Sequence, residues 1–256
     1  MNSRVRLFVL VAFLGMVFAG PLRAAEGGAV GDEPATGDEL AARLCSVQPA
    51  KMSEVTGKLK IRAGSVRKEV PFLLRIEPIA TDWKTTYEIA GTTDTSAEKF
   101  VVIHRASGSN DYFFARAARP GDKVGDLQRM TAAETAVPLA GSDFWLGDLA
   151  LDFLRWPQQR KLKGEMRLGQ PCYVLESLNP DARDVVRVKS WIMKEAEAPA
   201  IMVAEAYDNR GKQVKEFTIS ASGLRKVNGQ YQLEDMKMRN YKTGSETTLK
   251  FDLPRE

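Results

Sequence analysis

The chain of 256 residues contains one histidine, His104, and two cysteines, Cys45 and Cys172, that lie far apart in the sequence. These three side chains cannot supply the set of ligands that a typical zinc site needs. The sequence also lacks a Gly-x-Ser-x-Gly elbow, a His-Glu-x-x-His helix, a Walker-type loop and an EF-hand loop. We therefore expect no metal, no cofactor, no catalytic residues and no enzymatic activity.

A strong excess of charge of one sign is also missing, because 37 basic residues stand against 33 acidic ones. The first 24 residues carry three arginines and no acid, so their removal lowers the net charge from +4 to +1. The short basic runs at 160–163 and 237–239 are typical of solvent-facing strands. Without a clustered basic surface we expect no nucleic-acid partner.

The apolar run over residues 7–20 is shorter than the roughly 20 residues of a membrane-spanning helix. It follows Arg4 and Arg6 and precedes a plausible cleavage site after Ala24, which is the pattern of a signal peptide. An uncleaved anchor is the alternative. We expect residues 1–24 to be removed, leaving no membrane span. Because Cys45 is the first cysteine, no lipid-bearing N-terminal cysteine is expected, and the predicted location is the periplasm.

Two interpretations of the cysteines stay open. In an oxidising compartment Cys45 and Cys172 could form a disulfide, which would tie the N-terminal segment to a strand past the middle of the chain. They could equally be two buried free thiols, because a sequence does not give the distance between them.

Residues 25–37 are small, polar and rich in glycine, which indicates a flexible leader. Thr36 and Glu39 have the spacing of a capping box, and the apolar residues after them predict a short helix that ends before Pro49. No internal repeat follows, so we interpret residues 38–256 as a single domain.

Most of the chain alternates between apolar and polar residues with a period of two, which predicts β-strands. The strands follow one another through turn sequences without intervening helices, and this order indicates an antiparallel sheet. Asn228-Gly229 is the strongest hairpin signal among the turns. About a dozen strands are expected, at 55–61, 70–76, 83–89, 100–105, 112–118, 160–168, 172–177, 185–194, 201–207, 212–222, 231–241 and 246–253.

Residues 119–141 have weak periodicity and are predicted to be a loop. Ser142 then resembles an N-cap, and the sequence predicts a helix over 143–156 that ends at Pro157. Its apolar residues fall on more than one face. Such a helix lies between two apolar surfaces, or between one surface and a ligand.

Four stretches in the second half of the chain occur in the order of a known family's motifs. The chain resembles the outer-membrane lipoprotein-sorting proteins, the LolA/LolB-like family, over about residues 140–244. Met193 departs from the family pattern, which has aspartate there. The stretches are Gly141-Ser142-Asp143-Phe144 with Asp148-Leu149, Val188-Lys189-Ser190-Trp191-Ile192 with Lys194-Glu195 and Pro199, Glu205-Ala206-Tyr207-Asp208 with Gly211-Lys212 and Lys215, and Lys226-Val227-Asn228-Gly229 with 236–240 and Thr243-Gly244.

The resemblance implies a mostly β fold, in which a curved antiparallel sheet forms an incomplete barrel and two or three short helices cover its concave side as a lid. It also implies an acylated lipoprotein or other lipid as ligand, and inner- and outer-membrane sorting proteins as possible partners. From strand alternation we expect an apolar ligand-binding cavity formed by one face of the strands and by the helix over 143–156, namely Leu59, Ile61, Phe72, Leu74, Trp83, Tyr87, Trp191, Phe144, Leu149 and Phe153.

Three functions are compatible with the sequence. The first is a periplasmic carrier that binds acyl chains in an apolar cavity and moves them toward the outer membrane. Each methylene removed from water gains about 0.8 kcal/mol, which makes such a container useful. The second is a non-catalytic envelope sensor or scaffold, whose concave side would be filled by its own side chains. The third is an enzyme acting on a lipid or glycan near His104, a residue that we instead expect to be a half-buried strand histidine.

Overall fold

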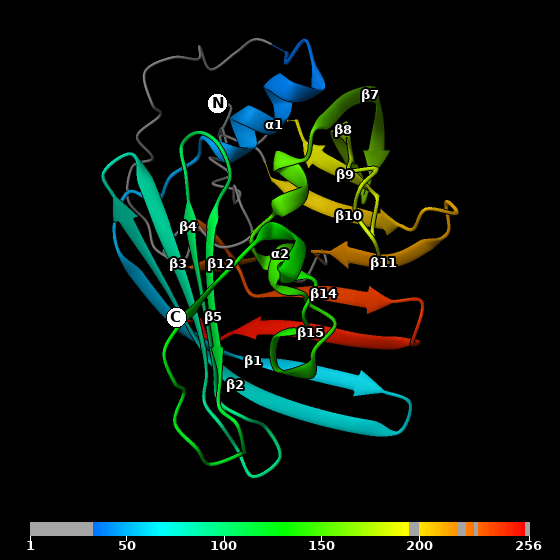
Figure 1. The fold of residues 1–256 in the computed structure, drawn as a ribbon. Coiled ribbons are helices and arrows are strands. Elements are labelled where there is room, and N and C mark those ends of the chain that lie inside the picture. Colours follow the sequence, from blue (N-terminus) through cyan, green and yellow to red (C-terminus); the bar gives the residue numbers. More distant parts are fainter. Residues whose placement is uncertain (1–32, 195–199, 220–223, 228–229, 254–256) are drawn as a thin grey trace.

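The computed structural model describes residues 33–194, 200–219, 224–227 and 230–253 (Figure 1). The predicted signal peptide and the tip of the predicted hairpin at Asn228-Gly229 lie outside the described residues. The strands on either side of that tip pair with each other, with Val227 opposite Gln230. These two strands, β12 (Leu224–Val227) and β13 (Gln230–Leu233), form a separate small sheet.

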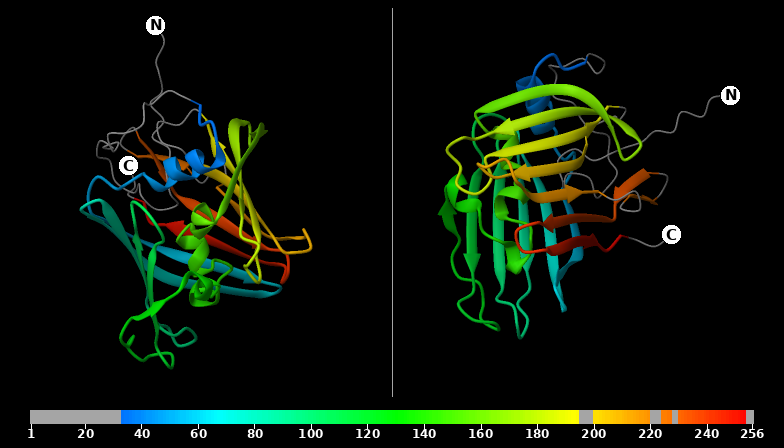
Figure 2. Two further views of the ribbon diagram at one scale, coloured as in Figure 1. Left: turned by 45° about the horizontal axis from the view of Figure 1, so that its top comes forward. Right: turned by 90° about the vertical axis from the view of Figure 1, so that its right-hand side faces the viewer.

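The other thirteen strands form one antiparallel sheet in the order β6-β5-β4-β3-β2-β1-β15-β14-β11-β10-β9-β8-β7. The sheet curves strongly but does not close, so β6 and β7 remain as its edges (Figure 2). The prediction of an incomplete antiparallel barrel is confirmed. The strands are β1 (Ser53–Ala63), β2 (Val66–Ile79), β3 (Asp82–Ile89), β4 (Glu98–His104), β5 (Asp111–Arg116), β6 (Gln128–Met130), β7 (Gln158–Arg167), β8 (Gln170–Leu178), β9 (Arg187–Met193), β10 (Ile201–Tyr207), β11 (Gln213–Thr218), β14 (Asp235–Asn240) and β15 (Ser245–Phe251).

Alternation along the strands gives the sheet its two faces. From Ser53 to Leu59 of β1 and throughout β15 every second residue is buried, and the buried ones face the concave side. The residues between them are charged or polar, and some form ion pairs with neighbouring strands, such as Lys58 of β1 with Glu69 of β2 at 3.1 Å. Strand β6 was not predicted, because three residues are too few for a period of two to be recognised.

The connection between the two edge strands crosses the open side of the barrel (Figure 1). We call residues 132–155 of this connection the lid segment. The single helix predicted over 143–156 is wrong. The lid segment instead contains four short pieces, which are η1 (Ala132–Thr135), η2 (Leu139–Gly141), α2 (Leu146–Leu149) and η3 (Asp152–Arg155).

The backbone of Leu151 explains why no long helix forms. Its φ of 53° is left-handed, so the helical geometry ends between α2 and η3. Breaking the helix there turns the chain, and apolar residues that would surround a straight helix can all contact the curved sheet. Tertiary packing has therefore overridden the local helix pattern.

Helix α1 (Gly37–Cys45) begins as predicted, since the Thr36 side chain accepts a hydrogen bond from the Glu39 amide at 3.1 Å. It packs on β7. A Cβ at Gly37 would lie only 2.5 Å from the backbone nitrogen of Arg160, so this position requires glycine. Contact with the sheet starts before the helix, because Glu33 pairs with Lys161 at 3.0 Å. The described structure thus begins inside the segment expected to be a leader.

Candidate functional site

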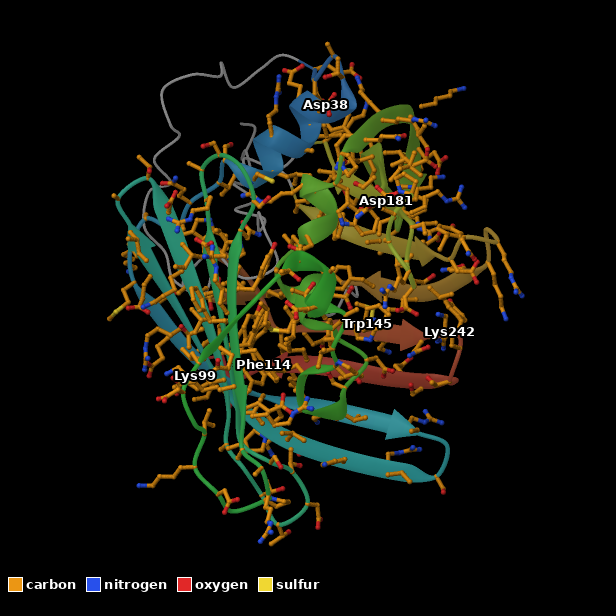
Figure 3. All side chains as sticks on the ribbon, in the orientation of Figure 1. Asp38, Lys99, Phe114, Trp145, Asp181 and Lys242 are labelled. Atoms are coloured by element: carbon orange, nitrogen blue, oxygen red, sulfur yellow. The ribbon has the colours of Figure 1, made fainter. Side chains whose placement is uncertain are left out.

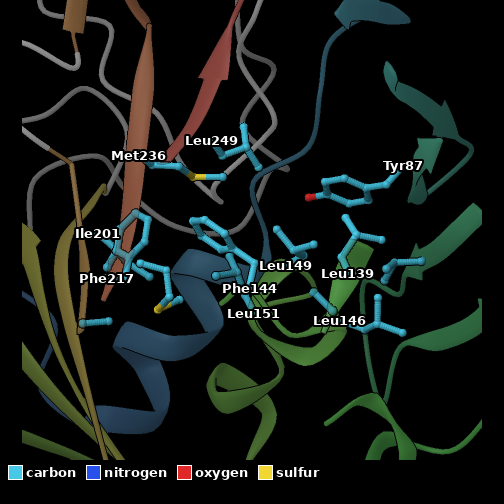
Figure 4. Packing of buried hydrophobic residues seen from close by; sticks show 14 of the residues in the cluster. Tyr87, Leu139, Phe144, Leu146, Leu149, Leu151, Ile201, Phe217, Met236 and Leu249 are labelled. Carbon is cyan, nitrogen blue, oxygen red and sulfur yellow. The ribbon is translucent and has the colours of Figure 1, made fainter. Parts of the chain in front are cut away.

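A continuous apolar cluster fills the space between the concave face of the sheet and the lid segment. Figure 4 shows Phe144 and Leu149 of the lid segment between Ile201 and Phe217 on one side and Tyr87 on the other. Nine of the ten predicted cavity residues belong to this cluster or pack against it, with Ile61 only partly buried. They are Leu59, Ile61, Phe72, Leu74, Trp83, Tyr87, Phe144, Leu149 and Phe153.

Trp191 was assigned to the wrong face. It belongs to a second apolar cluster on the outer side of β8, β9 and β10. Its indole nitrogen donates a hydrogen bond to Glu165 at 2.9 Å, and the Arg167 guanidinium lies 4.4 Å from its ring centre. The next residue, Ile192, joins the concave cluster instead. A shift of one residue reverses the face in a strand, and the sequence around Trp191 is apolar on both faces.

The two cysteines are free thiols, so the possible disulfide is not formed. Cys45 packs against the concave cluster, whereas Cys172 lies in the outer cluster. The sheet separates the two side chains, which explains why they do not pair. Burial raises the pKa of both thiols.

The hollow beneath the lid segment is small. Its volume is about 30 Å³, and its walls include Phe144, Leu149, Phe153 and Lys215. Pockets that enclose ligands usually measure about 300 Å³ or more. The predicted residues therefore come together, but in this structure the lid side chains occupy the space where an acyl chain was expected.

A larger open groove of about 870 Å³ lies elsewhere, along β1 to β4 and next to residues 124–127. Its lining mixes apolar side chains such as Leu73 with the charged side chains of Lys58, Glu88 and Lys99. Of the ten predicted cavity residues, only Phe72 also lines this groove.

Buried polar bonds attach the lid segment to the sheet. Asp143 is 5% exposed and accepts hydrogen bonds from the hydroxyls of Ser245 and Thr247, at 2.5 Å and 2.8 Å. The Asp143 amide in turn donates to the Thr247 hydroxyl at 2.9 Å. All three bonds join the lid segment to one strand, β15, at the middle of the sheet.

A second attachment is the partly buried ion pair between Lys215 of β11 and Asp148 of α2, with 2.7 Å between nitrogen and oxygen. The same Asp148 oxygen accepts a hydrogen bond from the Trp145 amide at 2.8 Å, which begins α2. The Lys215 ammonium also lies 3.6 Å from the centre of the Trp145 ring. Figure 3 marks Trp145 on the lid segment over the middle of the sheet.

A third attachment involves Asp152 of η3, which accepts hydrogen bonds from the Tyr112 hydroxyl of β5 and, at 3.1 Å, from the Thr135 hydroxyl of η1. Burial raises the pKa of Asp152 to about 6. Nearby, Arg155 donates to the carbonyls of Gly108 and Arg105 at 2.5 Å and 2.6 Å. Polar contacts with three strands, β15, β11 and β5, therefore attach the lid segment to the sheet.

The sequence alone indicates no role for Lys215, Asp148 or Asp143, although all three lie in the stretches that resemble the LolA/LolB-like family. A signal for Lys215 was present. Phe217 faces the concave cluster, and a residue two positions earlier in a strand shares its face. A lysine at an inward position of a strand indicates either a buried ion pair or a binding residue.

His104 is more buried than expected, with 6% of its surface exposed. Its Nε2 lies 3.0 Å from the Thr85 hydroxyl, and its ring stacks on Trp83 with 3.7 Å between centres. Burial lowers its pKa to about 3, so the ring is neutral at physiological pH.

Across the described ranges, no group of three His, Cys, Asp or Glu side chains could hold a metal ion. Within the same ranges, no helix has the length and apolar character needed to cross a membrane.

A family model described as "Uncharacterized protein" matches residues 82–255. No curated protein matches the chain.

Several solved structures share the fold, among them the following three. A DUF1329 family protein from Desulfovibrio piger has a TM-score of 0.67 and 19% identity, and the match covers 84% of this chain and 90% of that one. A putative outer membrane lipoprotein-sorting protein domain from Vibrio parahaemolyticus has a TM-score of 0.67 and 20% identity, and the match covers the same shares of the two chains. A LolA superfamily protein from Nitrosomonas europaea has a TM-score of 0.59 and 16% identity, and the match covers 86% of this chain and 94% of that one. At these identities the likeness concerns the fold.

Proposed function

This chain belongs to the family whose model matches residues 82–255 and has the LolA-type fold, and from this premise we propose that it is a periplasmic carrier of acyl chains. The carrier binds the acyl chains of lipoproteins or other lipids against the concave face and moves them toward the outer membrane. Its partners are a lipid or acylated protein and the membrane proteins that deliver and receive it. The role is non-catalytic.

One observation carries the proposal. The apolar concave face is covered by a segment with little regular structure that polar bonds attach to the sheet at separate points. Covering the face with the chain's own Phe144, Leu149 and Phe153 keeps it from water when no ligand is present. When the polar bonds break, the same apolar area becomes available to a hydrocarbon tail, at about 25 cal/mol for each Å² removed from water.

The closed state accounts for the small hollow beneath the lid segment. A site for a long acyl chain needs on the order of ten times the 30 Å³ found there. The carrier therefore binds its ligand by exchange, in which the tail takes the place of lid side chains. The apparent affinity for the ligand is then the affinity of the open state multiplied by the fraction of molecules that are open.

Mass spectrometry of lipid extracted from the purified protein tests this function, together with titration of a fluorescent fatty-acid probe. Co-purified acyl chains, or saturable probe binding that natural lipids displace, support the carrier. Protein that contains no lipid and binds no probe contradicts it.

The same small hollow favours the second candidate, a non-catalytic envelope sensor or scaffold, because a concave side filled by its own residues is what that function requires. The two candidates differ in the effect of lipid on the lid segment. If the protein is a carrier, hydrogen–deuterium exchange at the amides of residues 139–151 becomes faster when an acyl ligand is added, because the lid segment is displaced. If it is a scaffold, exchange at these amides has the same rate with and without lipid.

A further inference from the structure

Lys215 projects from β11 into the concave cluster beside Phe217. Only 3% of its side-chain surface is exposed. Burial lowers the pKa of this lysine, because the surrounding side chains solvate an ammonium poorly, while Asp148 acts in the opposite direction. A cation in such a place needs a negative partner, since an unpaired buried charge is strongly destabilising.

The partners of Lys215 come from the lid segment. Asp148 supplies the carboxylate at 2.7 Å and Trp145 supplies the ring at 3.6 Å. The neighbouring strands place Ala206 and Asn240 directly beside Lys215, and neither carries a charge. The ammonium is therefore fixed to the sheet, whereas its counter-ion is attached to the segment that covers the sheet.

This arrangement has a consequence for any ligand that replaces the lid segment. Displacement of the lid segment removes from Lys215 both Asp148 and Asp143, the other carboxylate that acts on this ammonium. A hydrocarbon tail on the concave face then keeps water away from the ammonium. The complex is stable only when the ligand itself brings a negative oxygen to that point. An uncharged ligand of the same length leaves the cation buried and unpaired.

We propose that Lys215 binds the anionic head group of a single-chain lipid, a carboxylate or a phosphate, whose tail replaces Phe144, Leu149 and Phe153 on the concave face. This assignment rests on the proposed carrier function and narrows its ligand to acidic lipids. Lys215 lines the hollow together with Phe217 and Met238, so head group and tail lie on one continuous surface. A charged hydrogen bond of this kind corresponds to about a ten- to hundredfold preference for an acid over the matching alcohol.

Calorimetric titration with dodecanoate, dodecanol and dodecyl phosphate tests the assignment. The wild-type protein is expected to bind the two acids at least about tenfold more tightly than the alcohol. Lys215→Met is expected to bind the alcohol and lose the preference. Lys237→Met is the matched control, because Lys237 lies on the outer face of β14 and pairs with Glu246 at 3.3 Å; it should keep the preference.

Equal binding of acid and alcohol by the wild type overturns the assignment but leaves the carrier function intact. Retention of the preference in Lys215→Met also overturns it. Failure to bind any of the three lipids contradicts the carrier function itself. If Lys215→Met does not fold, Asp148→Asn provides the second test, because it removes the competing carboxylate and is expected to raise acid affinity more than alcohol affinity. A larger gain for the alcohol overturns the proposal.

Discussion

Replacement of Thr247 by valine tests whether the polar attachments hold the lid segment closed. The Thr247 hydroxyl donates to the Asp143 carboxylate at 2.8 Å and accepts from the Asp143 amide at 2.9 Å. Valine has almost the same shape but removes both bonds. A hydrogen bond to a charged group contributes about 1.5–3 kcal/mol, and a buried amide without a partner costs about 1–3 kcal/mol. Thr247→Val is therefore expected to destabilise the closed lid by about 3 kcal/mol.

The consequence for binding follows from the proposed exchange. If the open state is a minor population, a loss of about 3 kcal/mol in the closed state raises that population about 100-fold. The apparent affinity for a fluorescent fatty-acid probe should rise by the same factor, while urea unfolding shows reduced stability. Thr248→Val is the matched control, because Thr248 follows in the same strand on the opposite face and should change stability by less than about 0.5 kcal/mol.

The reasoning fails if Thr247→Val loses stability yet binds the probe with unchanged affinity. In that case the lid segment is a permanent part of the core and its attachments do not control access to the concave face. An equal effect of Thr248→Val would show that any change in β15 has the same result, and would also refute the role of Asp143.

Three further predictions concern stability. Phe144→Ala should lower the free energy of unfolding by about 3–5 kcal/mol and, if the carrier proposal holds, acyl ligand should restore part of it; chemical denaturation without any ligand-dependent recovery would contradict this. The pKa of His104 is lowered to about 3, so between pH 6.5 and about 3 the unfolded state binds a proton that the folded state does not. As the pH is lowered through this range, the wild-type free energy of unfolding should decrease by about 1.4 kcal/mol per pH unit relative to that of His104→Gln. Parallel pH curves for the two proteins would disprove this protonation linkage. Leu168→Gly should raise stability by about 0.5–1 kcal/mol, because Leu168 is 51% exposed and has a φ of 50°; a drop in thermal midpoint would show that its side chain matters more than its backbone strain.

Local patterns predicted the parts of the site that depend on one strand at a time. Alternation placed residues such as Leu59, Phe72 and Tyr87 on a common apolar face, since the period of two is a property of each strand. It failed at Trp191, where Met193 and Ile192 are also buried and the strand is apolar on both faces. In such a strand the pattern does not indicate which face meets the lid segment.

The lid segment shows the limit of local patterns in a different way. The apolar residues between 143 and 156 indicated a helix packed on more than one side, whereas the structure places most of them in one cluster with the concave face of the sheet. The helix itself is broken at Leu151, because the segment has to connect β6 to β7 across a curved surface. The path between two edge strands is set by the sheet, which the local sequence does not contain.

The sequence by itself determined the antiparallel strands, the helix start at Thr36 and the apolar character of the concave face, because each depends on residues close together in the chain. Only the tertiary structure decided the face of Trp191, the separation of Cys45 from Cys172, and the pairing of Lys215 with Asp148. These depend on contacts between distant segments, and the Lys215 and Asp148 positions are 67 residues apart. Their meeting follows from the curvature of a sheet that stays open and is covered by its own chain.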